Sequence, residues 1–106
     1  MRIISGAGEP TADSWIEHLA VPDLSVGTYC IPAGGIDEQS PHTEDEIYIV
    51  TAGQAKLAAG GEVAEVQPGS VVYVPAGEVH RFTDIAEDLV VLVVFGPAEY
   101  SRAAEG

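Results

Sequence analysis

The chain has 106 residues, 46% of them hydrophobic, which suits a single domain with one core and leaves no room for a separate cofactor domain. Four basic side chains stand against seventeen acidic ones, and the formal net charge of −13 argues against phosphate backbones and anionic lipid as partners. The longest apolar run, Leu89 to Phe95, is too short to cross a bilayer, and the N-terminus lacks the apolar stretch of a signal peptide, so we expect a cytoplasmic protein without nucleic-acid or membrane partners.

Turn-forming and strand-forming residues alternate along the whole chain. Residues 1–13 are expected to form an irregular arm, and residues 97–106 a tail that is frayed or adds one helical turn. Between them, the pattern predicts nine short strands at residues 14–19, 25–31, 40–43, 46–51, 54–59, 63–66, 70–74, 80–83 and 89–95. Ala52-Gly53 and Gly60-Gly61 are each expected to form a hairpin turn.

The spacing of these short strands indicates the fold class. Turns recur roughly every eight to twelve residues, and no helical periodicity is sustained between them. This pattern is typical of a β sandwich or barrel, and short strands in this number suit an all-β, double-sheet jelly roll. We therefore expect one domain that spans residues 1–106.

Two stretches of the sequence carry the residues with the most chemistry. Residues 34–53 include His42 and Glu46, and residues 69–80 end at His80, so two of the three histidines lie in these stretches. Imidazoles and a carboxylate gathered inside a small β structure are typical of a transition-metal site. The histidines are far apart in sequence, so only the fold could bring them together.

Both stretches resemble the sequence motifs of the cupin family. The first family motif reads Gly, five residues, His, one, His, three or four, Glu, six, Gly, and it is matched here by Gly34, Ser40, His42, Glu46 and Gly53, with Ser40 in the place of the first His. The second motif is matched by Gly69, Pro75, Gly77 and His80, with Asp84 in the place of a final Asn. The resemblance covers roughly residues 24 to 96.

The resemblance implies a jelly-roll (cupin) barrel that holds a divalent transition metal ion. It makes His42, Glu46 and His80 the metal ligands, a set that suits Fe, Mn, Ni or Zn and leaves coordination positions open for a substrate. Glu46 could also leave the metal and act as a general base. The alternative is a cupin without metal, in which the two histidines only form hydrogen bonds in the cavity.

Ser40 is the departure from the family pattern that bears most on the metal. Strand alternation puts Ser40 and His42 on the same side, but a neutral hydroxyl is a poor ligand for these metals. The amide oxygen of Gln39 could take the fourth position if the strand begins after Gln39, and water could fill it instead. Ser40, Tyr48 and Phe82 are expected to line the substrate pocket.

Several other side chains are assigned structural roles. Trp15, Tyr29 and Tyr73 are expected to pack in the core, as aromatic residues on short strands commonly do. Glu44, Asp45 and Glu78 are expected to lie in solvated turns. The lone Cys30 excludes an intrachain disulfide and is expected as a buried thiol on a strand.

These features together predict a small metal-dependent enzyme of the dioxygenase type, with Glu46 as a catalytic residue, acting on a small organic molecule inside the barrel. The alternatives are a non-catalytic module that binds a small molecule, or a metal-assisted isomerase or hydrolase. A homodimer is also expected, because residues 89–95 are apolar on both faces and one face should seek a partner. Alternatively, the arm around Trp15 and Ile16 covers that face within one chain.

Overall fold

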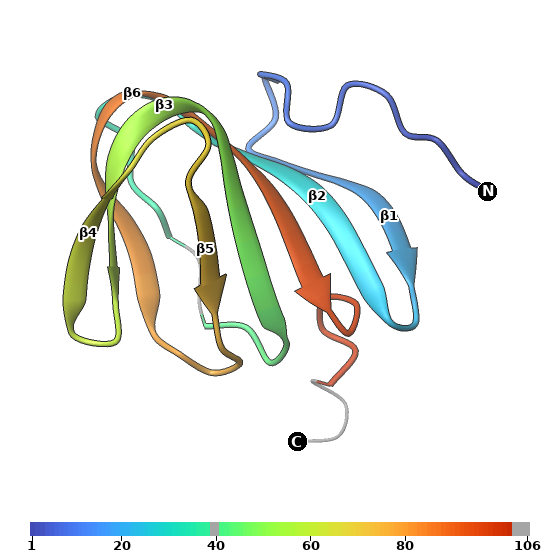
Figure 1. Cartoon of the computed structure of the whole chain (residues 1–106). Coiled ribbons are helices and arrows are strands. Elements are labelled where there is room, and N and C mark those ends of the chain that lie inside the picture. The colour runs from blue at the N-terminus through green and yellow to red at the C-terminus, as the bar shows by residue number, and fades with distance from the viewer. Residues whose placement is uncertain (39–40, 103–106) are drawn as a thin grey trace.

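A computed structural model describes residues 1–38 and 41–102 of the chain (Figure 1). These residues form six strands: β1 (Trp15–Val21), β2 (Leu24–Ile31), β3 (Asp45–Ala59), β4 (Glu62–Val66), β5 (Val71–Val74) and β6 (His80–Gly96). The described residues include no helix, and therefore none long and apolar enough to cross a membrane. The arm, residues 1–13, precedes the first strand and contains turns and bends but no strand.

All strand pairs are antiparallel, and the strands form one curled sheet in the order β1-β2-β6-β3-β4, with β5 also paired to β3. In Figure 1 the sheet folds over on itself, so that β4 and β5 lie on one side and β1 and β2 on the other. The all-β jelly roll predicted from the sequence is confirmed, with a sheet that stays open at the β1 edge.

Two long strands replace four of the predicted short ones. Residues 46–51 and 54–59 are continuous in β3, and residues 80–83 and 89–95 are continuous in β6. Gly53 is not a hairpin turn: it has φ of 90°, and a Cβ atom built on it would lie 2.3 Å from the backbone oxygen of Asp88 in β6. Gly53 therefore allows β3 to bend while it stays beside β6, with irregular register between Val50 and Lys56.

The Gly60-Gly61 hairpin is confirmed, since both residues have positive φ (57° and 80°) and they join β3 to β4. The strand predicted at residues 40–43 is wrong for residues 41–43, which belong to a loop. The backbone oxygen of His42 accepts a hydrogen bond from the Gly77 N–H at 2.8 Å, so this loop is tied to a turn and not to a strand ladder. Ser40 and Gln39 lie outside the described residues.

The core lies between the two halves of the folded sheet. Alternate residues of β6 point into it, and Leu89, Val91, Val93 and Phe95 are at most 2% exposed. Tyr48 and Val50 of β3 and Phe82 of β6 complete its centre. One face of residues 89–95 therefore fills the barrel, although the sequence, which is apolar on both faces, did not indicate which.

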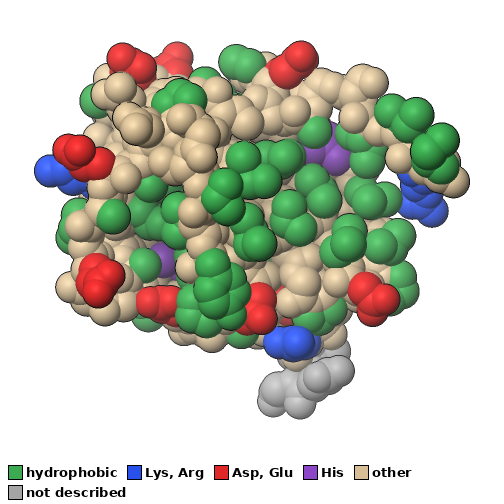
Figure 2. Space-filling view, viewed as in Figure 1, with side chains coloured by type: hydrophobic (Ala, Val, Ile, Leu, Met, Phe, Trp, Pro, Cys, Tyr) green, Lys and Arg blue, Asp and Glu red, His purple; other side chains and the backbone are tan. Residues whose placement is uncertain are grey.

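The opposite face of the sheet presents a patch of apolar side chains, called here the outer apolar patch. Register places its members side by side on β3, β5 and β6: Ile47, Ile49, Val71, Tyr73, Leu92 and Val94. Val71 is 67% and Tyr73 61% exposed, so Tyr73 is not a core residue as predicted. Figure 2 shows hydrophobic side chains gathered across the middle of this face. The arm reaches this face beside the patch, through hydrogen bonds of Gly8 to the side chains of Thr28 and Thr51.

The described part of the tail, residues 97–102, folds back against the barrel as turns, neither helical nor frayed. Glu44 holds it there: its carboxylate accepts hydrogen bonds from the backbone N–H groups of Tyr100 (2.6 Å) and Arg102 (3.0 Å), and from the Thr43 hydroxyl. Glu44 is only 1% exposed, so its assignment to a solvated turn is wrong. Its lowered pKa reflects these hydrogen bonds, which outweigh the opposing effect of burial.

Candidate metal centre

Three side chains with metal-binding atoms converge at one end of the barrel. His42 precedes β3, Glu46 is the second residue of β3, and His80 is the first residue of β6. One ligand atom from each lies within 4.8 Å of the others, and the residues are 7%, 2% and 4% exposed. The sequence motifs therefore selected three residues that the fold does bring together.

The bend of the β3–β6 pair makes this convergence possible. His80 is paired in register with Ala59, which lies thirteen positions beyond Glu46 along β3. A straight strand would separate those two positions by roughly 43 Å, at about 3.3 Å per residue. Because β3 bends around Gly53, the Nε2 atom of His80 instead lies 2.8 Å from Oε1 of Glu46.

The buried polar atoms of this cluster are incompletely satisfied. Neither carboxylate oxygen of Glu46 has a partner in hydrogen-bond geometry, although Oε1 lies 2.8 Å from His80 Nε2 and 3.6 Å from His42 Nδ1. The Nδ1 atom of His42 also has no such partner. Buried polar atoms are rarely left without partners, so a group of three that face one another fits a bound cation.

Hydrogen bonds to the far side of each ring orient the imidazoles. Nδ1 of His80 lies 2.8 Å from the backbone oxygen of Glu78, and an Nδ1–H that donates there leaves the Nε2 lone pair facing Glu46. Nε2 of His42 lies 3.1 Å from Oε2 of Glu99, and an Nε2–H that donates there leaves the Nδ1 lone pair facing Glu46. Such outer partners commonly fix the tautomer of metal-binding histidines.

Glu99 is a residue of the site that the sequence motifs did not indicate. It lies in the tail, more than fifty positions after His42, and belongs to neither motif. Its backbone N–H donates to the Ser25 hydroxyl at 2.8 Å, and Glu44 holds the residues that follow. No sequence signal marked this carboxylate, because its place depends on how the tail folds.

The three candidate ligands perturb one another's protonation. Burial by itself would lower the pKa of His42 and of His80, but the Glu46 carboxylate outweighs it, and the pKa of each imidazole is raised above 6.5. Burial would conversely raise the pKa of Glu46, but the two imidazoles lower it below 4.5. Without a metal, the cluster therefore tends to hold a proton on an imidazole beside an ionised carboxylate.

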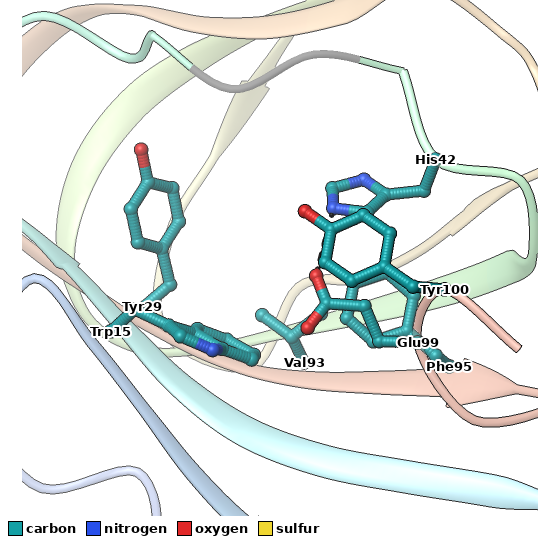
Figure 3. A pocket seen from close by; sticks show the side chains of 7 residues that line it. All are labelled: Trp15, Tyr29, His42, Val93, Phe95, Glu99 and Tyr100. Atoms are coloured by element: carbon teal, nitrogen blue, oxygen red, sulfur yellow. Dashed lines mark hydrogen bonds and ion pairs between the residues drawn. The ribbon is translucent and has the colours of Figure 1, made fainter. Parts of the chain in front are cut away.

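A cavity of about 210 Å³ adjoins His42 (Figure 3). It is lined by Trp15, Tyr29, His42, Val93, Phe95, Glu99 and Tyr100. Trp15 and Tyr29 were predicted to pack in the core; both are half-buried and pack against the core cluster, and both also line this cavity. Burial raises the pKa of the Glu99 carboxyl, and nearby Glu17 and Glu44 add to the effect while His42 opposes it.

Two residues predicted for the substrate pocket, Tyr48 and Phe82, lie on the His80 side of the cluster's contacts and are not among the residues that line the cavity beside His42. The hydroxyl of Tyr48 is 2.8 Å from His80 Nε2, and the Phe82 ring packs on the Tyr48 ring with centroids 4.8 Å apart. Both side chains are completely enclosed. The other pocket residue predicted from the sequence, Ser40, lies outside the described residues, as does Gln39, the predicted fourth ligand.

Comparisons with known proteins agree with this architecture. The family model described as Cupin domain matches residues 27–95. An uncharacterised protein of Streptomyces coelicolor is 49% identical over 86 residues, which cover 81% of this chain and 82% of that protein.

Solved structures show the same fold at low sequence identity. An uncharacterised protein with a double-stranded β-helix domain from Klebsiella pneumoniae superposes with a TM-score of 0.73 at 21% identity, over 92% of this chain and 90% of that one. The DMSP lyase DddQ from Ruegeria pomeroyi gives a TM-score of 0.72 at 22% identity, over 90% of this chain and 54% of that one. These likenesses support the jelly-roll assignment made from the strand pattern.

Proposed function

The chain belongs to the cupin family, and we propose that it is a metal-dependent enzyme that acts on a small organic molecule in the cavity beside His42. The observation that carries the proposal is the convergence of His42, Glu46 and His80, whose ligand atoms lie within 4.8 Å of one another and whose side chains are buried. Two imidazoles and a carboxylate suit Fe, Mn, Ni or Zn and leave coordination positions open.

The surrounding residues would give the site its chemical function. A bound ion would supply Lewis-acid chemistry or, if it is iron, dioxygenase-type oxidation. Glu46 would hold the ion through its buried carboxylate, and it is also our candidate for a general base. The Glu99 carboxylate and the backbone oxygen of Glu78 hold the two imidazoles in orientation, and aromatic side chains line the cavity where the molecule would bind.

A second candidate function is metal-assisted chemistry without oxidation, such as isomerisation or hydrolysis, with the same three residues. It is favoured by the structural likeness to a protein named as a lyase, which indicates that this fold also hosts non-oxidative reactions. A non-catalytic role, in which the cavity only holds a small molecule, uses the cavity without the reactive role of Glu46.

The first test is metal content per chain in the wild type and in two histidine variants. His80→Ala removes one of three ligands, while His18→Ala is the matched control because His18 bonds to Thr28 outside the cluster. Structural zinc sites bind with about 10–16 kcal/mol over four ligands, so one lost ligand should weaken affinity by about a hundredfold. Equal metal content in His80→Ala and His18→Ala would contradict the proposal.

The second test separates the classes of function. Iron-loaded and zinc-loaded protein would be screened for oxygen uptake with phenols, thiols and diketones, and for conversion of the same compounds without oxygen. Oxygen uptake by the iron form alone supports the dioxygenase type, and conversion by both forms supports Lewis-acid chemistry. Saturable binding with no turnover in either form would favour the non-catalytic alternative.

A further inference from the structure

The cavity beside His42 has an unusual combination of walls. Four of its seven lining residues are aromatic, namely Trp15, Tyr29, Phe95 and Tyr100, and its one carboxylate belongs to Glu99. No Lys or Arg is among the described residues that line it. Figure 3 shows Trp15 and Tyr29 on one side of the space, with Glu99 and Tyr100 across from them.

The Glu99 side chain is only 10% exposed, and its basic partner is His42, at 3.1 Å; no Lys or Arg pairs with it among the described residues. Its hydrogen-bonding partners include His42 and the Tyr100 side chain, and the carboxylates of Glu17 and Glu44 are near enough to repel it. A negative charge held in a mostly apolar enclosure favours a positively charged neighbour. An anionic ligand would add repulsion there.

The aromatic walls are held in place before any ligand arrives. The Tyr29 hydroxyl donates to Asp37 at 2.8 Å, and Trp15 meets Phe95 edge-to-face with ring centroids 6.3 Å apart. The indole of Trp15 lies directly over Gly27, where an added Cβ would come within 2.2 Å of the ring. This fixed geometry makes the cavity a prepared site and not a gap left by poor packing.

We propose that this cavity binds a small organic cation of the quaternary ammonium type, and, resting on the proposed function, that such cations are the substrate class of the metal centre. The faces of aromatic rings carry negative electrostatic potential and attract such cations, and the carboxyl group of Glu99 lies in the same cavity. A net charge of −13 favours their approach. The volume of about 210 Å³ is sufficient for a compact cation of this type.

The test uses three probes of the same shape and different charge: choline, its neutral isostere 3,3-dimethylbutan-1-ol, and the anion 3,3-dimethylbutanoate. Trp15 is the only tryptophan, so its fluorescence reports on this cavity. Chelator-treated protein is titrated first, which keeps the result independent of metal. We expect saturable binding of choline at least tenfold tighter than that of the neutral probe, and no binding of the anion.

Variants separate the role of Glu99 from general charge. Glu99→Gln should weaken choline about tenfold and leave the neutral probe unchanged, while Glu65→Gln, which removes the same charge from exposed strand β4, should leave both unchanged. The proposal is overturned if the neutral probe binds as tightly as choline, if no probe binds, or if both variants act alike. If one of these results is found while His80→Ala still lowers the metal content, the proposed function is retained and only the cation site is rejected. If choline binds but the wild type holds no metal, only the proposed function is rejected.

Discussion

The buried carboxylate of Glu44 gives the sharpest prediction, because it joins the tail to the barrel. Glu44→Ala removes the acceptor for the backbone N–H groups of Tyr100 and Arg102. A hydrogen bond to a charged group contributes about 1.5–3 kcal/mol, so two of them set an upper limit near 6 kcal/mol. Water can reach the freed N–H groups of the tail, and we therefore expect a loss of about 2–3 kcal/mol.

For a domain of this size, that loss corresponds to a fall in melting temperature of roughly 8–20 °C. Thermal and urea unfolding measure it, and Trp15 fluorescence reports whether the tail has also left the cavity. Glu44→Gln should lose about half as much, because its amide oxygen can still accept one of the bonds. Glu65→Ala, at an exposed site on β4, is the control. If Glu44→Ala is no less stable than Glu65→Ala, our account of the tail is wrong.

Two further predictions concern protonation and assembly. The raised pKa values of His42 and His80 stabilise the metal-free protein below about pH 6.5, and this stability should be lost as the pH rises through the folded-state pKa. Metal affinity should instead increase over this pH range, because metal binding displaces the protons from the imidazoles. Urea unfolding and competition titrations from pH 5.5 to 8.5 check both, and parallel trends would contradict the assignment. We also propose that the protein forms a homodimer through the outer apolar patch. The double substitution Val71→Lys and Tyr73→Lys should convert this dimer to a monomer of 11.0 kDa, as measured by sedimentation equilibrium. A wild-type protein that is monomeric at every concentration would rule out the dimer.

Local sequence signals were sufficient to place most of the strands. The apolar run marked residues 89–95 as a strand of the core, and the Gly60-Gly61 pair marked a hairpin turn, in which both residues have positive φ. Gly53 misled the prediction, because a glycine that ends a strand and one that lets a strand bend beside another backbone look the same in sequence. The difference depends on Asp88, which lies 35 positions away.

The candidate site shows the same division between local and distant information. The spacing of two motifs was enough to select His42, Glu46 and His80, which the structure brings together. Glu44 and Glu99 were missed because their environments come from the tail, and a short acidic residue in a turn-rich segment usually faces solvent. Long-range contacts, and not residue type, made these carboxylates part of the site.

The bend in β3 gives the metal centre a mechanical meaning. Glu46 and His80 lie at opposite ends of the paired strands β3 and β6, and they come into contact only because this pair of strands is bent. A metal ion bound by both residues would be a reversible cross-link between the two ends of the bent β3–β6 pair, and it would close a long loop of chain. Metal binding would then stabilise the curvature of the barrel, so the metal-free and the metal-bound protein would differ in stiffness as well as in chemistry.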